Sequence, residues 1–177
     1  VAFGRELGVK KPEPYTVGNE AMRQRWADPE GLQIIGDAAI ANRINDTYTA
    51  LWDDKQFKIM DEQYDRAVRL EGPGGQLCYG RPHSGNIFSS ILASMPDGRY
   101  EPHHIIVRQQ PEQPVRVALR WSYCGTHSGN GRYGESTGCP LALLGISHFE
   151  LREGKILNEW LVMDETAVYA QIAAYQS

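Results

Sequence analysis

The stretch LALLGISHFELREGKILNEWLVMD, residues 141–164, decides the fold of this chain. It is typical of a β-hairpin in which two largely apolar strands are joined by a two-residue turn at Glu153-Gly154. A turn of this length predicts that the strands pair in step from the turn outward. Ser147 then lies opposite Trp160, and both side chains point to the same face.

The predicted pairing sorts the hairpin onto two faces, because successive residues of a strand point to opposite sides. The first face carries Leu143, Gly145, Ser147, Phe149, Trp160, Val162 and Asp164. The second face carries Leu144, Ile146, His148, Leu157, Glu159, Leu161 and Met163, with His148 opposite Glu159. Both faces are mostly apolar, so we expect both to be covered. A ligand pocket would cover the first face and a second subunit the other, which makes a homodimer the expected assembly.

The composition is that of an ordinary globular protein. The 177 residues suffice for one domain with a core, and 41% of them are hydrophobic and 23% charged. A net charge of -4 without any basic run disfavours nucleic-acid binding. No apolar segment approaches the roughly 18 residues of a membrane span, so no membrane contact is expected. The cysteines, Cys78, Cys124 and Cys139, form no CxxC pair, which favours reduced thiols and a cytoplasmic protein.

The rest of the chain predicts helices and further strands around this hairpin. Residues 1–30 are polar and interrupted by Pro12 and Pro14, so we expect an arm or linker there. From Leu32 to Trp52 apolar residues recur every three or four positions, which predicts an amphipathic helix. The other expected elements are strands at 64–70, 77–79, 100–110 and 115–124, and helices at 82–95 and 166–175. This order predicts an α+β fold, with helices packed on the concave face of a curved antiparallel sheet that forms an open cone.

Three motifs carry a resemblance to a known family: RWSYCGTHSG at 120–129, TGCP at 137–140 and FELREGKILNEW at 149–160. Together with the order of the elements, they resemble the SnoaL-like polyketide cyclase family. That family belongs to the nuclear transport factor 2-like (cystatin-like) superfold, which also includes ketosteroid isomerase. The resemblance implies a single SnoaL-like domain over residues 31–177. The hairpin looks most like a branch of the family in which two such domains share one polypeptide, so this chain is expected to be one half of such a protein.

The resemblance implies a pocket inside the cone, with different polar groups. In the cyclases an Asp on the strand before the turn acts as acid and base, and Ser147 occupies that position here. The family sequence EHWD is replaced by NEWL at residues 158–161, whereas Asp164 matches a family Asp four residues past the Trp. The fold and the pocket are therefore implied, and polyketide ring closure is not expected.

Three titratable residues are candidates for catalysis. Asp164 is a candidate general base, because desolvation beside an aromatic wall favours the neutral form of a carboxyl group. Its alternative role is to cap the closing helix. His148 and Glu159 form the second candidate, in which Glu159 orients the imidazole and His148 shuttles a proton. The alternative for this pair is a structural bridge on the subunit-contact face.

The remaining candidates would bind a substrate. Ser147 is placed to donate a hydrogen bond to a substrate oxygen, and His127 lies in the glycine-rich loop 125–138, either over the pocket mouth or bonded to backbone. The aromatic candidates for the pocket wall, each of which also fits a packed core, are Trp52, Tyr64, Trp121, Phe149 and Trp160. His103 and His104 point oppositely on one strand, so no metal site is expected, and no cofactor either.

Two functions are compatible with these residues. The first is a cofactor-independent enzyme that transfers a proton on a small hydrophobic carbonyl compound, as an isomerase, dehydratase, cyclase or hydrolase. The second is a non-catalytic domain for small-ligand binding or assembly. An open cavity favours the first function, whereas an interior filled by tryptophan side chains favours the second.

Overall fold

The computed structural model describes residues 31–177, so the predicted arm at 1–30 lies outside the described residues. The strands are β1 (Gln33–Ile35), β2 (Tyr64–Glu71), β3 (Leu77–Tyr79), β4 (Arg99–Arg108), β5 (Val115–Thr126), β6 (Pro140–Arg152) and β7 (Lys155–Met163). The helices are α3 (Ala38–Trp52), α4 (Ile59–Gln63), α5 (Arg81–Ser94) and α6 (Glu165–Tyr175), with a short 3-10 turn η1 (Pro73–Gly75). Within this part of the chain, no helix is long and apolar enough to span a bilayer.

The described strands form one curved sheet in the order β1-β4-β5-β6-β7-β2-β3. Strands β4 to β7 pair antiparallel, as predicted, while β1 joins β4 and β2 joins β7 in parallel. Strand β1 was not predicted, because Ile34 fitted the apolar period of the following helix. The helix begins only at Ala38, after Gly36 turns the chain with a φ of 95°. A Cβ at Gly36 would lie 2.3 Å from the Val107 carbonyl oxygen, so this close turn requires glycine.

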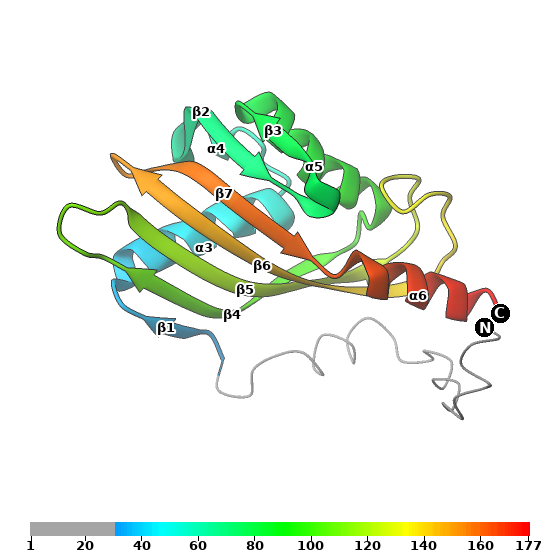
Figure 1. Cartoon of the computed structure of the whole chain (residues 1–177). Helices are drawn as coiled ribbons and strands as arrows, with labels where there is room; N and C mark the ends of the chain where they lie inside the picture. Colours follow the sequence, from blue (N-terminus) through cyan, green and yellow to red (C-terminus); the bar gives the residue numbers. More distant parts are fainter. Residues whose placement is uncertain (1–30) are drawn as a thin grey trace.

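Helices α3, α4 and α5 cover one side of the sheet, and α6 continues from the end of β7 (Figure 1). The side chain of Asp37 starts α3 by accepting hydrogen bonds from the backbone of Ala39 and Ile40. The apolar stripe of α3, which includes Ala41, Ile44, Tyr48 and Leu51, is buried against the concave face of the sheet. The predicted α+β cone with helices in its concavity is therefore confirmed.

The turn at the tip of the central hairpin has the predicted form, but the pairing beyond it does not. Glu153 and Gly154 both have positive φ values, 50° and 77°, as a two-residue hairpin turn requires. Leu151 then pairs with Ile156, but Glu150 pairs with Asn158, so that Leu157 is an extra residue in β7. Such a β-bulge shifts all later pairs by one residue.

The bulge corrects the predicted faces of β7. Ser147 lies opposite Leu161 instead of Trp160, and His148 lies opposite Trp160 instead of Glu159. The β6 residues keep their predicted sides, whereas the end of β7 is reversed. Glu159, Leu161 and Met163 now face the interior, and the outward set consists of Trp160, Val162 and Asp164.

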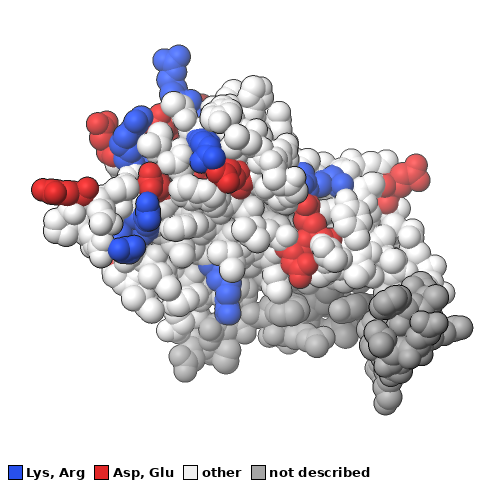
Figure 2. All heavy atoms as spheres, in the orientation of Figure 1, with Lys and Arg blue, Asp and Glu red and all other residues white. Residues whose placement is uncertain are grey.

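The view of Figure 2 shows acidic and basic side chains mixed over the surface instead of gathered by sign. Five of the described ion pairs, such as Arg116–Glu150 and Arg152–Asp65, join neighbouring groups of opposite charge. This distribution, with the net charge of -4, gives no electrostatic footprint for a nucleic acid on that face.

Candidate functional site

A carboxyl group lies in the interior of the cone, and two tyrosine hydroxyls bind it. Glu159 of β7 reaches the interior because the bulge turns it inward, and its side chain is fully buried. Tyr48 of α3 donates a short hydrogen bond to Oε1, and Tyr64 of β2 donates to Oε2 over 2.9 Å. Three elements that are distant in sequence therefore meet at one carboxylate.

Two further side chains extend this cluster across the sheet. The Ser147 Oγ lies 2.6 Å from the Tyr48 Oη. Because the Tyr48 hydrogen is directed to Glu159, Ser147 donates its own hydrogen to Tyr48. Trp121 Nε1–H in turn donates to Ser147 Oγ over 3.0 Å. The donors thus form a chain, from Trp121 through Ser147 and Tyr48, that points at the carboxylate.

The site titrates near neutral pH. Burial raises the pKa of Glu159 to about 7, and the hydrogen bonds from Tyr48 and Tyr64 oppose part of this rise. Burial and the neighbouring carboxylate raise the pKa of both tyrosines well above its usual range. The proton that exchanges around pH 7 therefore belongs to Glu159. A carboxyl group with this pKa is suited to both acid and base roles.

Aromatic side chains enclose the cluster. The Tyr48 ring meets Phe149 edge-on at a centroid distance of 5.3 Å, and the Trp52 ring lies 4.9 Å from that of Trp121. The side chains of this aromatic group are fully buried: Tyr48, Trp52, Tyr64, Phe88, Trp121, Tyr123 and Phe149. These rings pack against one another, so aromatic side chains fill much of the interior around the cluster.

The structure brings some of the predicted site residues together and separates others. Those that share the interior are Trp52, Tyr64, Trp121, Ser147, Phe149 and Glu159. Those that do not are His127, His148, Trp160 and Asp164. The predicted pair of His148 and Glu159 is wrong as geometry, because the two side chains lie on opposite faces of the sheet. The catalytic and binding roles of the individual residues stay predictions.

The outward residues make ordinary structural contacts. Asp164 caps α6 by accepting a hydrogen bond from the Ala167 backbone over 3.0 Å, which is the alternative weighed for it above. His148 packs against Trp160 at a centroid distance of 5.5 Å. A cavity of about 390 Å³ lies on this outer face, with Arg120, Leu144, Ile146, Val162 and Asp164 among its lining residues.

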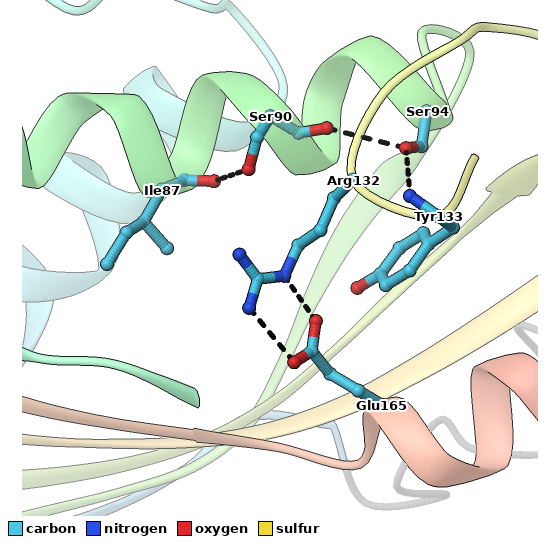
Figure 3. Close-up of polar contacts among 6 residues, drawn as sticks. All are labelled: Ile87, Ser90, Ser94, Arg132, Tyr133 and Glu165. Carbon is cyan, nitrogen blue, oxygen red and sulfur yellow. Dashed lines mark hydrogen bonds and ion pairs between the residues drawn. The ribbon is translucent and has the colours of Figure 1, made fainter. Parts of the chain in front are cut away.

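The glycine-rich loop is packed against α5 and α6 (Figure 3). Arg132 forms a two-pronged ion pair with Glu165, and the Tyr133 backbone donates to Ser94 Oγ over 3.2 Å. A Cβ on Gly131 would lie 2.5 Å from the Ser90 carbonyl oxygen, so this glycine permits close packing. The loop thus covers the end of α5 and is not stretched across an open mouth.

His127 lies at the start of that loop and is fully buried. Its Nδ1 is 3.0 Å from Thr137 Oγ1, while its backbone carbonyl accepts hydrogen bonds from the amides of Thr137 and Gly138. These contacts tie the loop's two ends together. Among residues 31–177, no group of three or more His, Cys, Asp or Glu side chains is placed to hold a metal ion.

The family model for SnoaL-like polyketide cyclases matches residues 42–172. The chain belongs to the SnoaL-like polyketide cyclase family. This assignment agrees with the curved sheet and the helices that cover its concave side.

Solved structures share the SnoaL-like fold at low sequence identity. TsrD from Streptomyces laurentii has a TM-score of 0.66 at 15% identity, covering 78% of this chain and 98% of that chain. AclR from Streptomyces galilaeus has a TM-score of 0.64 at 15% identity, with 78% and 87% covered. IdmH from Streptomyces antibioticus has a TM-score of 0.58 at 20% identity, with 73% and 97% covered. Likeness at these identities shows the fold alone. A comparison with curated proteins found no match.

Sequence analysis missed Tyr48 as a member of this SnoaL-like site. The residue was recognised as part of the apolar stripe of α3, and its inward direction follows from that. The missed signal was chemical, because a buried tyrosine brings a hydroxyl that needs a hydrogen-bond partner. A search for an inward-facing hydrogen-bond partner of the Tyr48 hydroxyl would have suggested both Ser147 and an inward-facing Glu159.

Proposed function

We propose that this SnoaL-like domain binds a small, neutral, hydrophobic carbonyl compound inside the cone, and that Glu159 exchanges a proton with the carbon next to the carbonyl. The observation that carries the proposal is the buried Glu159 carboxyl group, held by two tyrosine hydroxyls and titrating near pH 7. A neutral ligand is favoured because a buried carboxylate repels anions and the surrounding wall is aromatic.

The proposed step balances without a cofactor. Ionised Glu159 takes a proton from the α-carbon, and the electron pair of the broken C–H bond moves to the carbonyl oxygen, giving an enolate. The neutral Glu159 then returns the proton, either to the same carbon or to another position of the conjugated system. Removal of the α-proton to give the enolate is the first step both of isomerisation and of the elimination of water. Tyr48 and Tyr64 stabilise the ionised form of Glu159, which is present before the first transfer and again after the second.

The place of Glu159 also supports the proposal. Ser147 stands where the family resemblance puts the acid of the cyclases, and the Tyr48 hydroxyl contacts both Ser147 and Glu159. The Glu159 carboxyl group therefore lies close to the position of the family's acid, separated from Ser147 by the Tyr48 hydroxyl, and it comes from the neighbouring strand β7. Because the interior is filled, binding requires that the aromatic side chains around the cluster move apart.

Exchange of the methyl protons of acetophenone in D₂O tests this function, because it measures proton transfer from carbon without the natural substrate. The protein is expected to accelerate the exchange, and Glu159→Gln is expected to lower the rate by about 10²-fold. Glu150→Gln, on the outer face beside Arg116, is the matched control and should keep the wild-type rate. Equal exchange by Glu159→Gln and the wild type would remove Glu159 from the mechanism.

A second candidate function rests on a different observation. The interior is filled, while the outer face exposes large apolar side chains on neighbouring strands, among them Ile35, Ile106, Ile146 and Val162. As the alternative to an enzyme, we propose that the domain is an assembly unit whose outer face contacts a second copy of the chain. A wild-type protein that does not accelerate acetophenone exchange, and that dimerises through this face, would favour assembly over catalysis.

A further inference from the structure

Trp52 is the last residue of α3 and lies at the centre of the aromatic interior. Its side chain is fully buried. Its ring lies 4.9 Å from the ring of Trp121 and also 4.9 Å from that of Tyr123, with Phe88 at 5.5 Å. The indole therefore has aromatic neighbours on several sides.

The indole N–H of Trp52 is a buried donor that finds no hydrogen-bond partner within residues 31–177. The other tryptophans of this region differ from it. Trp121 donates its N–H to Ser147 over 3.0 Å, and Trp160 lies on the outer face against His148. A buried N–H without an acceptor costs stability, and buried polar groups usually have partners. An orphan donor is therefore a position where an acceptor from outside the chain improves the energy of the bound state.

This donor belongs to the same interior as the acid. Trp52 packs on Trp121, which donates to Ser147, and the Tyr48 ring, whose hydroxyl binds Glu159, lies 6.4 Å from the Trp52 ring. The hydroxyl and indole hydrogens of Tyr48, Tyr64 and Trp121 are already committed to the cluster. Among these interior donors, Trp52 is the one left for a ligand. Removing a proton beside a carbonyl group needs both a base and a donor for the oxygen on which charge develops.

We infer that Trp52 donates the hydrogen bond that holds the carbonyl oxygen of the interior ligand, so that the ligand is a neutral aromatic or alicyclic ketone. The inference rests on the proposed function for the location of the ligand and adds the group that selects it. It also gives binding of the carbonyl oxygen and exchange of the proton to two different residues. Trp52 binds the oxygen, and Glu159 exchanges the proton. The ketone occupies space that opens when the rings around Trp52 move apart.

The test uses ¹⁵N-labelled full-length protein and two probes of similar shape, acetophenone and its hydrocarbon analogue cumene. The indole N–H signals are assigned by through-bond experiments, so the readout does not depend on a variant that folds. Acetophenone is expected to move the Trp52 signal downfield, as a new hydrogen bond does, whereas cumene should not. The Trp160 signal should stay in place with both probes, because that residue lies on the outer face.

Affinity measured on variants gives a second readout. The wild type is expected to prefer acetophenone over cumene by about fivefold, the equivalent of one net hydrogen bond. Trp52→Phe, which keeps an aromatic ring, should lose this preference, and Trp160→Phe should keep it. Glu159→Gln should also keep it while losing proton exchange, which separates the donor from the acid.

The outcomes distinguish failure of the Trp52 donor from failure of the interior ligand site. A Trp52 signal that responds equally to both probes, or a ketone preference that survives in Trp52→Phe, overturns the role of Trp52. That result leaves proton exchange by Glu159 standing. It would mean that the Trp52 N–H is directed at a neighbouring aromatic ring, a weaker contact. If neither probe moves any interior indole signal, the interior ligand site itself is wrong, and both proposals fall.

Discussion

Each face of the β6–β7 hairpin carries a few residues that depart from the usual rule of apolar residues inside and polar residues outside. The inner face buries a carboxyl group, hydroxyls and an indole N–H, and these groups satisfy one another around Glu159. The outer face leaves apolar side chains exposed, with Val162 at 65% and Ile146 at 52%. Buried polar groups need hydrogen-bond partners, and a patch of exposed apolar side chains is typical of a surface that contacts another molecule. This contrast is the basis for proposing proton transfer inside the cone and association on the outer face.

One structural detail creates this contrast. Without the extra residue Leu157, β7 would turn Trp160 and Val162 inward and Glu159 outward. The cone would then hold an apolar interior, and the carboxyl group would lie beside His148 at the surface. The bulge exchanges these positions, so the contact of Glu159 with Tyr48 and Tyr64 depends on it.

The largest expected effect comes from a pair of truncations that tests the bulge directly. Leu161→Ala should lower the free energy of unfolding by about 2–5 kcal/mol, because Leu161 is almost completely buried in the core. Val162→Ala, one residue on but facing outward, should change it by no more than about 0.5 kcal/mol. Urea denaturation of both variants measures the difference. The reverse order of effects would mean that β7 pairs in step with β6 and that Glu159 lies outside.

The second prediction concerns the pH dependence of stability. The pKa of Glu159 is raised to about 7 in the folded protein, whereas the unfolded chain has its ordinary value of 4.5. The folded state therefore binds more protons between these values. The contribution of Glu159 to stability is full below about pH 4.5 and is lost as the pH rises through about 7. The loss should amount to roughly 2–4 kcal/mol in the wild type.

Glu159→Gln should remove this pH dependence, because its amide does not titrate. The quantity to measure is the difference in free energy of unfolding between wild type and variant, from about pH 4 to about pH 8. Glu150→Gln, on the outer face, is the control and should retain the wild-type slope. A slope that persists in Glu159→Gln would show that the carboxyl group is not desolvated as described.

A smaller effect is expected from removing one donor of the cluster. Tyr64→Phe deletes the hydroxyl that binds Glu159 Oε2, so it should raise the pKa of Glu159 further and lower stability at alkaline pH by about 1–3 kcal/mol. Infrared titration of the buried carboxyl band gives that pKa. Tyr79→Phe, at an exposed position on the edge strand β3, should change neither quantity. A Glu159 pKa that is unchanged in Tyr64→Phe would contradict the hydrogen bond.

The fold followed from the sequence because its signals are periodic and local. The two-residue turn was read from Glu153-Gly154, and the faces of β5 and β6 from strict alternation. The bulge left no such mark. Leu157, Asn158 and Glu159 mix apolar and polar residues, and the prediction placed Trp160 inside by continuing the pairing in step from the turn. A local propensity to bury the larger apolar side chain was outweighed by partners from α3 and β2, which pairing rules within one hairpin do not include.

The site was predictable only in part for the same reason. Ser147, Trp121, Phe149 and Trp52 were expected to face the pocket, and they do share the interior. Their hydrogen bonds depend on Tyr48, which lies 99 positions before Ser147 in the chain. Contacts of that span follow from the packing of α3 into the cone and not from any motif. The cap at Asp164 shows the reverse case, because a local rule placed it correctly.

The smallest effect on the fold, and the sharpest test of the outer face, is expected from Val162→Lys. Because Val162 is exposed, a lysine there should change the free energy of unfolding by no more than about 0.5 kcal/mol. If a second copy covers this face, the new charges are forced into an apolar contact, and the dimer should weaken by about tenfold or more. Gln76→Lys, the same change of charge at an exposed position beside β3, is the control and should leave association intact. The masses of both variants and the wild type are compared by analytical ultracentrifugation across a range of concentrations. Equal association of all three would place any subunit contact elsewhere and leave the apolar residues around Val162 without a partner surface.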